Sequence, residues 1–251
     1  MTIRLEHADR VATLLIDRPD RRNALTLEMW QSIPRLLDEA ARIKGLRVLT
    51  VRGAPAAPFS AGADIHEMVE NRDDAEWLAA NHAAISNAQS QLARFEFPTI
   101  AFVDGDCIGG GCAIALACDI RVASPRARFG ITPAKLGLVY PFHDIKLLVD
   151  LVGPGQAKRL LYTGDLIDVS ESQAIGLVEI SANAPDALEQ SIANTSGNSH
   201  RAMKGLVRRL LDGQVCEDAE TRRVFADAFE GDDFLEGTQA FAEKRTPKFQ
   251  D

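Results

Sequence analysis

Short runs of apolar and β-branched residues recur along the first three quarters of the chain, each bounded by glycine, proline or aspartate. Runs of this length and composition are typical of strands buried in a sheet. The sequence therefore predicts strands over residues 11–16, 46–51, 98–103, 118–123 and 177–180.

Two segments between these runs are long enough for helices. Residues 26–44 begin with Thr26, a favourable N-cap. Residues 73–95 place Ile85 and Leu92 at roughly helical spacing. Because strands and helices alternate, we expect an α/β core with crossover connections.

The pattern changes after residue 185. From there it is helical throughout, with breaks near Gly197, Gly213 and residues 231–232. We therefore predict a core over residues 1–185 and an all-α subdomain over residues 186–251. No internal repeat or long linker separates the two parts, so the boundary marks a change in packing.

Composition narrows the classes of function. The chain has 28 basic and 36 acidic side chains, a net charge of −8. An acidic protein is a poor partner for nucleic acid or an anionic membrane. No apolar run approaches the ~20 residues of a membrane span, and the first ten residues do not resemble a signal peptide. We expect a cytoplasmic protein.

The cysteines and histidines do not follow a metal-binding pattern. Cys107, Cys112 and Cys118 fall in one apolar stretch, where buried thiols are common. The chain contains no Cys-x-x-Cys pair and no His-x-x-x-His pair. We expect neither a metal nor disulfides.

Two glycine-containing turns follow predicted strands and precede helices. We call residues 58–64 (PFSAGAD) the first turn and residues 104–112 (DGDCIGGGC) the second turn. Backbone N–H groups at a helix start suit a phosphate, or a carbonyl oxygen that gains negative charge. Close packing of a helix on a strand explains such glycines as well, so this observation alone leaves their function open.

Two nucleotide-binding interpretations fit poorly. The glycines of the second turn do not match G-x-G-x-x-G, and no acidic ribose partner is convincingly placed after them. No Gly-Lys-Ser/Thr ending supports a P-loop. An NAD-dependent enzyme is therefore disfavoured.

Both turns, together with two other segments, resemble the crotonase (enoyl-CoA hydratase/isomerase) superfamily. The segments are residues 18–25 (RPDRRNAL), 59–65 (FSAGADI), 109–120 (GGGCAIALACDI) and 241–245 (FAEKR), in the order of the family. The resemblance implies a spiral of ββα repeats, with C-terminal helices that pack across subunits in homotrimers or dimers of trimers. It also implies an acyl-CoA thioester substrate and no separate cofactor, since CoA is part of the substrate.

The same resemblance implies an oxyanion hole. By motif position, the backbone N–H groups of Ala63 and Gly110 hold the thioester oxygen and stabilise an enolate. Because these donors belong to the main chain, the side chains around them can vary without removing the hole.

The resemblance also implies positions that bind CoA. Arg22 sits where a cation meets phosphate, and Phe241 and Lys244 match a pair that reaches CoA from a neighbouring subunit. Alternatively, Arg22 and Lys244 are solvated surface charges, and Phe241 packs between helices. The backbone around the nucleotide would come from Ala24, Ala61, Asp64 and Ile65.

Hydratases of the family carry two glutamates that activate water, and this chain has Ala113 and Ala134 at those positions. Alanine can be neither acid nor base, so ordinary hydration is disfavoured. Loss of CO2 from a malonyl-type thioester produces the enolate without a base. Because the two glutamates are absent, the carboxylate of such a substrate also meets no like charge at these positions. The sequence therefore favours a decarboxylase-like lyase.

Residues 130–140 partly resemble the methylmalonyl-CoA decarboxylase branch, in which a threonine and a tyrosine face the acyl group. This implies that Tyr140 orients the carboxylate or relays a proton, and that Thr132 donates a hydrogen bond. Alternatively, Tyr140 makes a hydrogen bond that only supports the structure, and Thr132 makes a local hydrogen bond within a turn. The chain departs from that branch at Ala63, where the branch has a histidine, and at Ala113, where a glutamate persists.

His143 and Asp144 are the remaining polar candidates. An acid–base role of His143 would suit double-bond isomerisation, or hydration with substituted residues. Alternatively, Asp144 stabilises a helix N-terminus and His143 faces solvent. The alternative to an enzyme is a non-catalytic protein that kept the fold and binds acyl-CoA.

Overall fold

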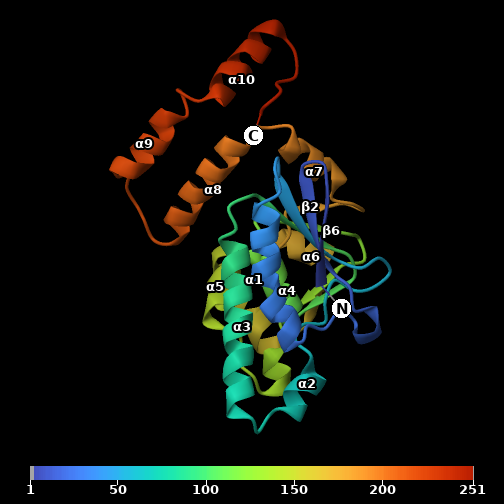
Figure 1. The fold of residues 1–251 in the computed structure, drawn as a ribbon. Helices are drawn as coiled ribbons and strands as arrows, with labels where there is room; N and C mark the ends of the chain where they lie inside the picture. Colours follow the sequence, from blue (N-terminus) through green and yellow to red (C-terminus); the bar gives the residue numbers. More distant parts are fainter. Residues whose placement is uncertain (1–2, 251) are drawn as a thin grey trace.

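The computed structural model describes residues 3–250, in which strands and helices alternate through the first three quarters (Figure 1). This confirms the α/β class. The larger sheet has six strands in the order β1-β2-β3-β4-β6-β9, and every pairing in it is parallel except that of β1 with β2. Its strands are β1 (Ile3–Ala8), β2 (Val11–Ile16), β3 (Val48–Gly53), β4 (Thr99–Val103), β6 (Ile120–Ala123) and β9 (Ile180–Ser181).

A second sheet has three short strands, β5 (Asp106–Ile108), β7 (Arg128–Gly130) and β8 (Leu166–Asp168). The sequence pattern did not predict them, because three residues are too few to display an alternation. Strands β4 and β6 of the large sheet are each followed by one strand of the small sheet and then by a helix. This is the ββα order that the resemblance implies.

The predicted strand over residues 177–180 is largely wrong. Only residues 180–181 pair, as β9, while Leu177 and Val178 are buried in the turn before it. Their backbone N–H groups donate to the carbonyl oxygen of Ser172 instead of a neighbouring strand. Here an apolar run fills the core without joining the sheet.

The helices of the core cover the large sheet and connect its strands. The long helix α5 is interrupted at Gly153, whose φ of 71° lies outside the helical region. These elements are η1 (Pro19–Arg21), α1 (Leu27–Ala41), α2 (Ile65–Glu70), α3 (Ala75–Ala93), α4 (Gly110–Ala117), η2 (Pro133–Leu136), α5 (Phe142–Thr163) and α6 (Val169–Ala174), where η denotes a 3-10 helix.

Alternate residues of the large sheet face two separate apolar clusters. Val48 and Phe102 belong to one cluster, whereas Leu49 and Val103 belong to the main core with α1, α3 and α4. This two-residue period is what a strand buried on both faces requires.

The predicted helical C-terminal region consists of α7 (Asp186–Ala193), α8 (Gly197–Leu211), α9 (Ala219–Asp227) and α10 (Asp232–Glu243). Leu188 and Ile192 of α7 pack against the smaller cluster on the sheet. Helices α8 to α10, which we call the C-terminal arm, extend beyond the core at the end opposite α2 (Figure 1). Lys204 of α8 attaches the arm to the core, donating to the carbonyl oxygen of Phe97 at 2.7 Å and to Asp119 at 2.6 Å. Among residues 3–250, no helix has the length and apolar character of a membrane span.

Candidate active site

The two glycine turns lie directly against each other. Ser60 of the first turn pairs in parallel with Cys107 of β5. The Ser60 N–H donates to the Asp106 carbonyl oxygen at 3.2 Å, and the Ile108 N–H donates to the Ser60 carbonyl oxygen at 2.9 Å. The first turn therefore extends the small sheet and reaches the N-terminus of α4.

Glycine is required for this contact. A Cβ added to Gly62 would come within 2.9 Å of the Gly110 nitrogen, and one on Gly111 within 2.6 Å of the Ser60 carbonyl oxygen. Gly109 has φ 53° and ψ −115°, a conformation that side chains with a Cβ rarely adopt. Close packing and exposed backbone donors thus occur together in these turns.

The N–H groups of Ala63 and Gly110 lie near each other and have no hydrogen-bond partner within residues 3–250. A Cβ on Gly110 would lie 3.3 Å from the Ala63 nitrogen. Gly110 is the first residue of α4, where an N–H has no partner within the helix and the helix dipole adds positive potential. The site therefore offers two backbone donors to one acceptor.

Hydrogen bonds hold the carbonyl oxygens of the same two peptide units. The Gly62 oxygen accepts from the Leu25 N–H at 2.8 Å, and the Gly109 oxygen accepts from the Ala113 N–H at 3.0 Å. In a trans peptide the C=O and N–H point in opposite directions. These bonds therefore leave the Ala63 and Gly110 N–H groups directed away from the atoms that hold the peptide.

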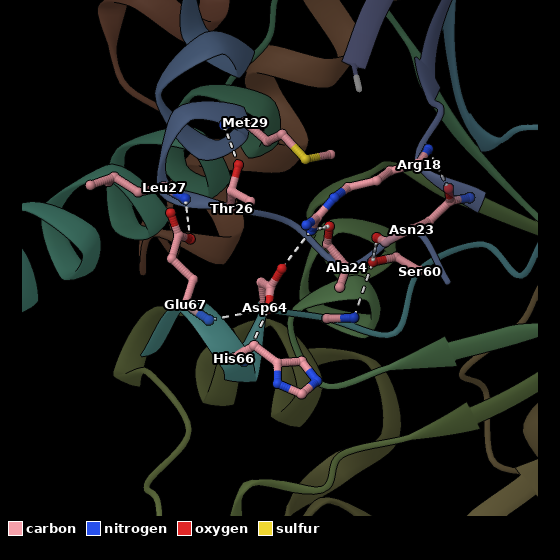
Figure 2. Close-up of polar contacts among 11 residues, drawn as sticks. Arg18, Asn23, Ala24, Thr26, Leu27, Met29, Ser60, Asp64, His66 and Glu67 are labelled. Carbon is pink, nitrogen blue, oxygen red and sulfur yellow. Dashed lines mark hydrogen bonds and ion pairs between the residues drawn. The ribbon is translucent and has the colours of Figure 1, made fainter. Parts of the chain in front are cut away.

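A polar network behind the first turn fixes its position (Figure 2). Arg18 donates to Asp64 at 2.6 Å and to the Ala24 carbonyl oxygen at 2.9 Å. Asp64 in turn accepts from the N–H groups of His66 and Glu67 at the start of α2. Burial would raise the pKa of Asp64, but the Arg18 hydrogen bond and the two backbone donors outweigh it and lower the pKa. The ionised carboxylate therefore ties residues 18–25 to the first turn.

We predict that Asp64→Ala lowers the free energy of unfolding by about 2–3 kcal/mol, because it removes a helix cap and leaves Arg18 without its carboxylate. Asp74→Ala is the matched control. Asp74 caps α3 through the same two backbone contacts but is exposed, so its loss should cost about 1 kcal/mol. Urea unfolding measures both values. Equal losses would show that the Arg18 pair contributes nothing.

Tyr140 and Thr132 lie beside the second turn. The Tyr140 hydroxyl donates to the Gly109 carbonyl oxygen at 3.0 Å, and the ring is buried. Burial raises the pKa of this hydroxyl, which keeps it neutral. A Cβ on Gly109 would lie 3.8 Å from the Thr132 hydroxyl. The Tyr140 hydroxyl donates to the protein's own backbone, as in the structural alternative, and its predicted contact with the acyl group stays a prediction.

His143 and Asp144 begin α5, and their Nδ1 and Oδ1 atoms lie 3.3 Å apart. Asp144 lies in the first turn of α5, as the alternative of a helix-stabilising aspartate requires, but its side chain is buried and makes no capping hydrogen bond. Burial raises the pKa of Asp144 to about 7, and the amide of Gln89 opposes this in part. Burial, together with Arg208, Arg94 and Lys146, lowers the pKa of His143.

Sequence reasoning missed Gln89. It lies in α3 one helical turn after Ile85, on the buried side. Its amide is near enough to Asp144 to influence the pKa of that carboxyl, but lies within hydrogen-bond distance of no group among residues 3–250. The Oδ2 atom of Asp144 lacks a partner there as well. The sequence could have indicated this residue, since Gln89 is a polar side chain on the apolar helix face formed by Ile85 and Leu92.

Comparisons with known proteins identify the family. A model of the enoyl-CoA hydratase/isomerase family matches residues 6–251. The chain belongs to this family.

Individual relatives support the assignment over the full length. The crotonyl-CoA hydratase of Syntrophomonas wolfei is 35% identical over 260 residues, covering 98% of this chain and 96% of that protein. The crystal structure of an enoyl-CoA hydratase/isomerase family protein from Hyphomonas neptunium has a TM-score of 0.93 and 38% identity, covering 100% of this chain and 98% of that one. A Magnetospirillum magneticum structure described as an enoyl-CoA hydratase/carnithine racemase has a TM-score of 0.94 and 28% identity, covering 100% and 96%. The predicted family and fold are confirmed.

Ala113 and Ala134 stand where the resemblance places the glutamates of family hydratases. Ala113 is buried in α4, one turn after Gly110, and Ala134 is exposed in η2. Neither side chain can carry a proton. Within residues 3–250, no group of three or more His, Cys, Asp or Glu side chains could hold a metal ion.

The structure gathers the predicted CoA positions of the N-terminal half around the first turn. Arg22 has a left-handed backbone conformation and pairs with Asp106 at 2.7 Å, so its guanidinium already contacts a carboxylate. The backbone N–H of Ala61 donates to the Arg22 carbonyl oxygen at 3.0 Å. The N–H of Asp64 donates to Leu25 at 2.9 Å, and Ile65 is partly exposed. The N–H groups of Ala61 and Asp64 are thus engaged within the protein.

Phe241 lies on α10, and Lys244 is the C-cap residue that follows it. This helix projects away from the core (Figure 1). The Phe241 side chain is 88% exposed, which contradicts the alternative of helix packing within one chain. Their predicted contact with the CoA of a neighbouring subunit stays a prediction.

Proposed function

We propose that this crotonase-family protein acts on an acyl-CoA thioester and stabilises its enolate with the N–H groups of Ala63 and Gly110. The observation that carries the proposal is that two adjacent backbone donors have no partner within residues 3–250 while their peptide units are held from behind. Loss of one such preorganised donor typically costs about 3 kcal/mol of transition-state stabilisation. The Arg18–Asp64 network and the glycine contacts supply the rigidity that preorganisation requires.

The reaction we favour is decarboxylation of a malonyl-type thioester. The bond between the α-carbon and the carboxylate breaks, CO2 leaves, and the electron pair becomes the enolate; a proton then adds to the α-carbon. This step needs an oxyanion hole and no general base, and Ala113 and Ala134 leave the two hydratase positions without carboxylates. Thr132, beside Gly109, has a hydroxyl that can donate to the acyl group.

Hydration or isomerisation is the second candidate. The relative from Syntrophomonas wolfei is named a crotonyl-CoA hydratase. The His143–Asp144 pair is an acid–base group that follows shortly after Tyr140, the residue hydrogen-bonded to Gly109 of the second turn. In this alternative the pair replaces the missing glutamates.

The test is incubation with methylmalonyl-CoA and, separately, with crotonyl-CoA, followed by mass spectrometry of the CoA products. We expect propionyl-CoA from the first and no hydrated product from the second. Hydration without loss of CO2 would reject decarboxylation and assign the chemistry to His143 and Asp144. Stabilisation by many acyl-CoA thioesters without turnover of any would instead identify a binding protein.

The proposal extends to the assembly. We expect a homotrimer or dimer of trimers in which Phe241 and Lys244 of each arm contact CoA in a neighbouring subunit. The 88% exposure of Phe241 and the projection of α9 and α10 beyond the core support this arrangement.

A further inference from the structure

The two donor peptides of the site are held differently. Among residues 3–250, the carbonyl oxygen of the peptide between Gly62 and Ala63 accepts one hydrogen bond, from the backbone N–H of Leu25. The peptide between Gly109 and Gly110 accepts two, from the backbone N–H of Ala113 and from the Tyr140 hydroxyl, both at 3.0 Å. Tyr140 is therefore the side chain that holds a donor peptide.

Tyr140 is placed rigidly for this contact. It is 5% exposed, lies 31 residues from Gly109 in sequence, and is followed immediately by Pro141 and α5. A ring buried to this extent has few alternative positions, so its hydroxyl stays directed at the Gly109 oxygen.

A hydrogen bond to the carbonyl of a peptide strengthens the N–H of the same peptide as a donor. The carbonyl draws electron density from the nitrogen through the amide resonance, and chains of hydrogen bonds reinforce each other by about 10–30% per bond. The Ala113 bond alone restrains the Gly109 carbonyl along the helix axis. A second bond from another direction also restrains rotation of the peptide plane, which sets where the Gly110 N–H points.

We infer that Tyr140 is a positioning residue, which aims and polarises the Gly110 N–H for the thioester oxygen without touching the reacting atoms. This inference rests on the proposed function, since it presumes that Gly110 contacts that oxygen. It assigns Tyr140 a role different from proton transfer. The raised pKa of the buried hydroxyl agrees with a group that keeps its proton throughout.

The effect of this residue falls on the transition state more than on substrate binding. Charge on the thioester oxygen grows as the enolate forms, so a stronger donor gains more there than in the ground state. We expect Tyr140→Phe to lower kcat by about 3- to 10-fold while KM changes less than 2-fold. The matched control is Tyr162→Phe, because Tyr162 is the second tyrosine of the chain and is 73% exposed on α5.

The decisive measurement is the infrared carbonyl band of bound propionyl-CoA labelled with 13C at the thioester carbon. Contact with the two N–H groups should move this band to lower frequency in the wild type and in Tyr162→Phe. We expect Tyr140→Phe to lose about 10–30% of that displacement. A merely structural role, which alters stability alone, would leave the band of the folded variant unchanged.

The outcomes separate the two proposals. A displaced band of equal size in the wild type and in Tyr140→Phe would overturn the role of Tyr140 and leave the oxyanion hole standing. The absence of any displacement in wild-type protein saturated with propionyl-CoA would overturn the hole, and the role of Tyr140 with it.

A second measurement covers the case in which Tyr140→Phe does not fold. In the Tyr162→Phe background Tyr140 is the one remaining tyrosine, so biosynthetic replacement with 3-fluorotyrosine alters this hydroxyl alone. Fluorination makes the hydroxyl a stronger donor, and we expect a larger displacement of the carbonyl band. An unchanged or smaller displacement would contradict the inference.

Discussion

Gly110→Ala is expected to lower kcat/KM by about 10²–10³-fold while the protein stays folded. The added Cβ would lie 3.3 Å from the Ala63 nitrogen and 3.1 Å from Cζ2 of Trp30. It would therefore crowd the space beside the Ala63 N–H, where the thioester oxygen would enter in the proposed mechanism. Gly110 has an ordinary negative φ at the first position of α4, so its backbone accepts alanine. The measurement is steady-state kinetics on whichever CoA thioester the wild type converts.

Two other glycines serve as controls for this result. A Cβ on Gly155, in α5, meets nothing within 4 Å, so Gly155→Ala should leave kcat/KM unchanged. A Cβ on Gly111 would come within 2.7 Å of the Ser60 Cβ as well as against its carbonyl oxygen, so Gly111→Ala should impair folding instead. Near wild-type turnover by folded Gly110→Ala would show that Gly110 does not face the thioester oxygen.

Asp144→Asn is expected to stabilise the protein increasingly as the pH rises. Burial raises the pKa of Asp144 from 3.8 to about 7. Between these values the native state holds a proton that the unfolded state has released, so wild-type stability falls as the pH increases and levels off above pH 7. A shift of this size corresponds to about 4 kcal/mol. An asparagine carries no charge and escapes this loss.

Urea unfolding of both proteins between pH 4 and pH 8 tests this prediction. The stability difference between Asp144→Asn and wild type should grow by roughly 4 kcal/mol over this range, with most of the growth between pH 4 and pH 7. Asp73→Asn is the control, because the Asp73 side chain is 91% exposed and its loss should change stability by less than about 0.5 kcal/mol. A constant difference across the range would mean that Asp144 ionises as freely in the folded protein as in the unfolded one.

The two predictions concern different parts of the same region. Gly110→Ala probes the donors proposed to contact substrate. Asp144→Asn probes a buried carboxyl that follows Tyr140, the tyrosine bonded to the peptide of one of those donors. If Asp144→Asn also abolished turnover, the hydration or isomerisation alternative would gain support. Decarboxylation as proposed uses no charge at Asp144 and predicts turnover within a few-fold of wild type.

Sequence pattern determined the class of fold and the order of its main elements. Strands β2, β3, β4 and β6, helices α1 and α3, and the helical C-terminal region are visible because each buries a regular series of apolar residues. The motifs around Ala63 and Gly110 also identified the family, because close backbone contact demands glycine at fixed positions. These are local requirements, and a linear sequence records them directly.

Tertiary structure alone decided which groups meet. The adjacency of the Ala63 and Gly110 donors, the contact of Tyr140 with Gly109 and the burial of Asp144 near Gln89 join residues far apart in the chain. The small sheet and the true extent of β9 also depended on such contacts. Side-chain direction and burial arise from packing between elements, which no single segment encodes. Sequence therefore determined the family and the positions of the backbone donors, whereas only the folded chain showed that the Tyr140 hydroxyl is bonded to the peptide that carries one of them.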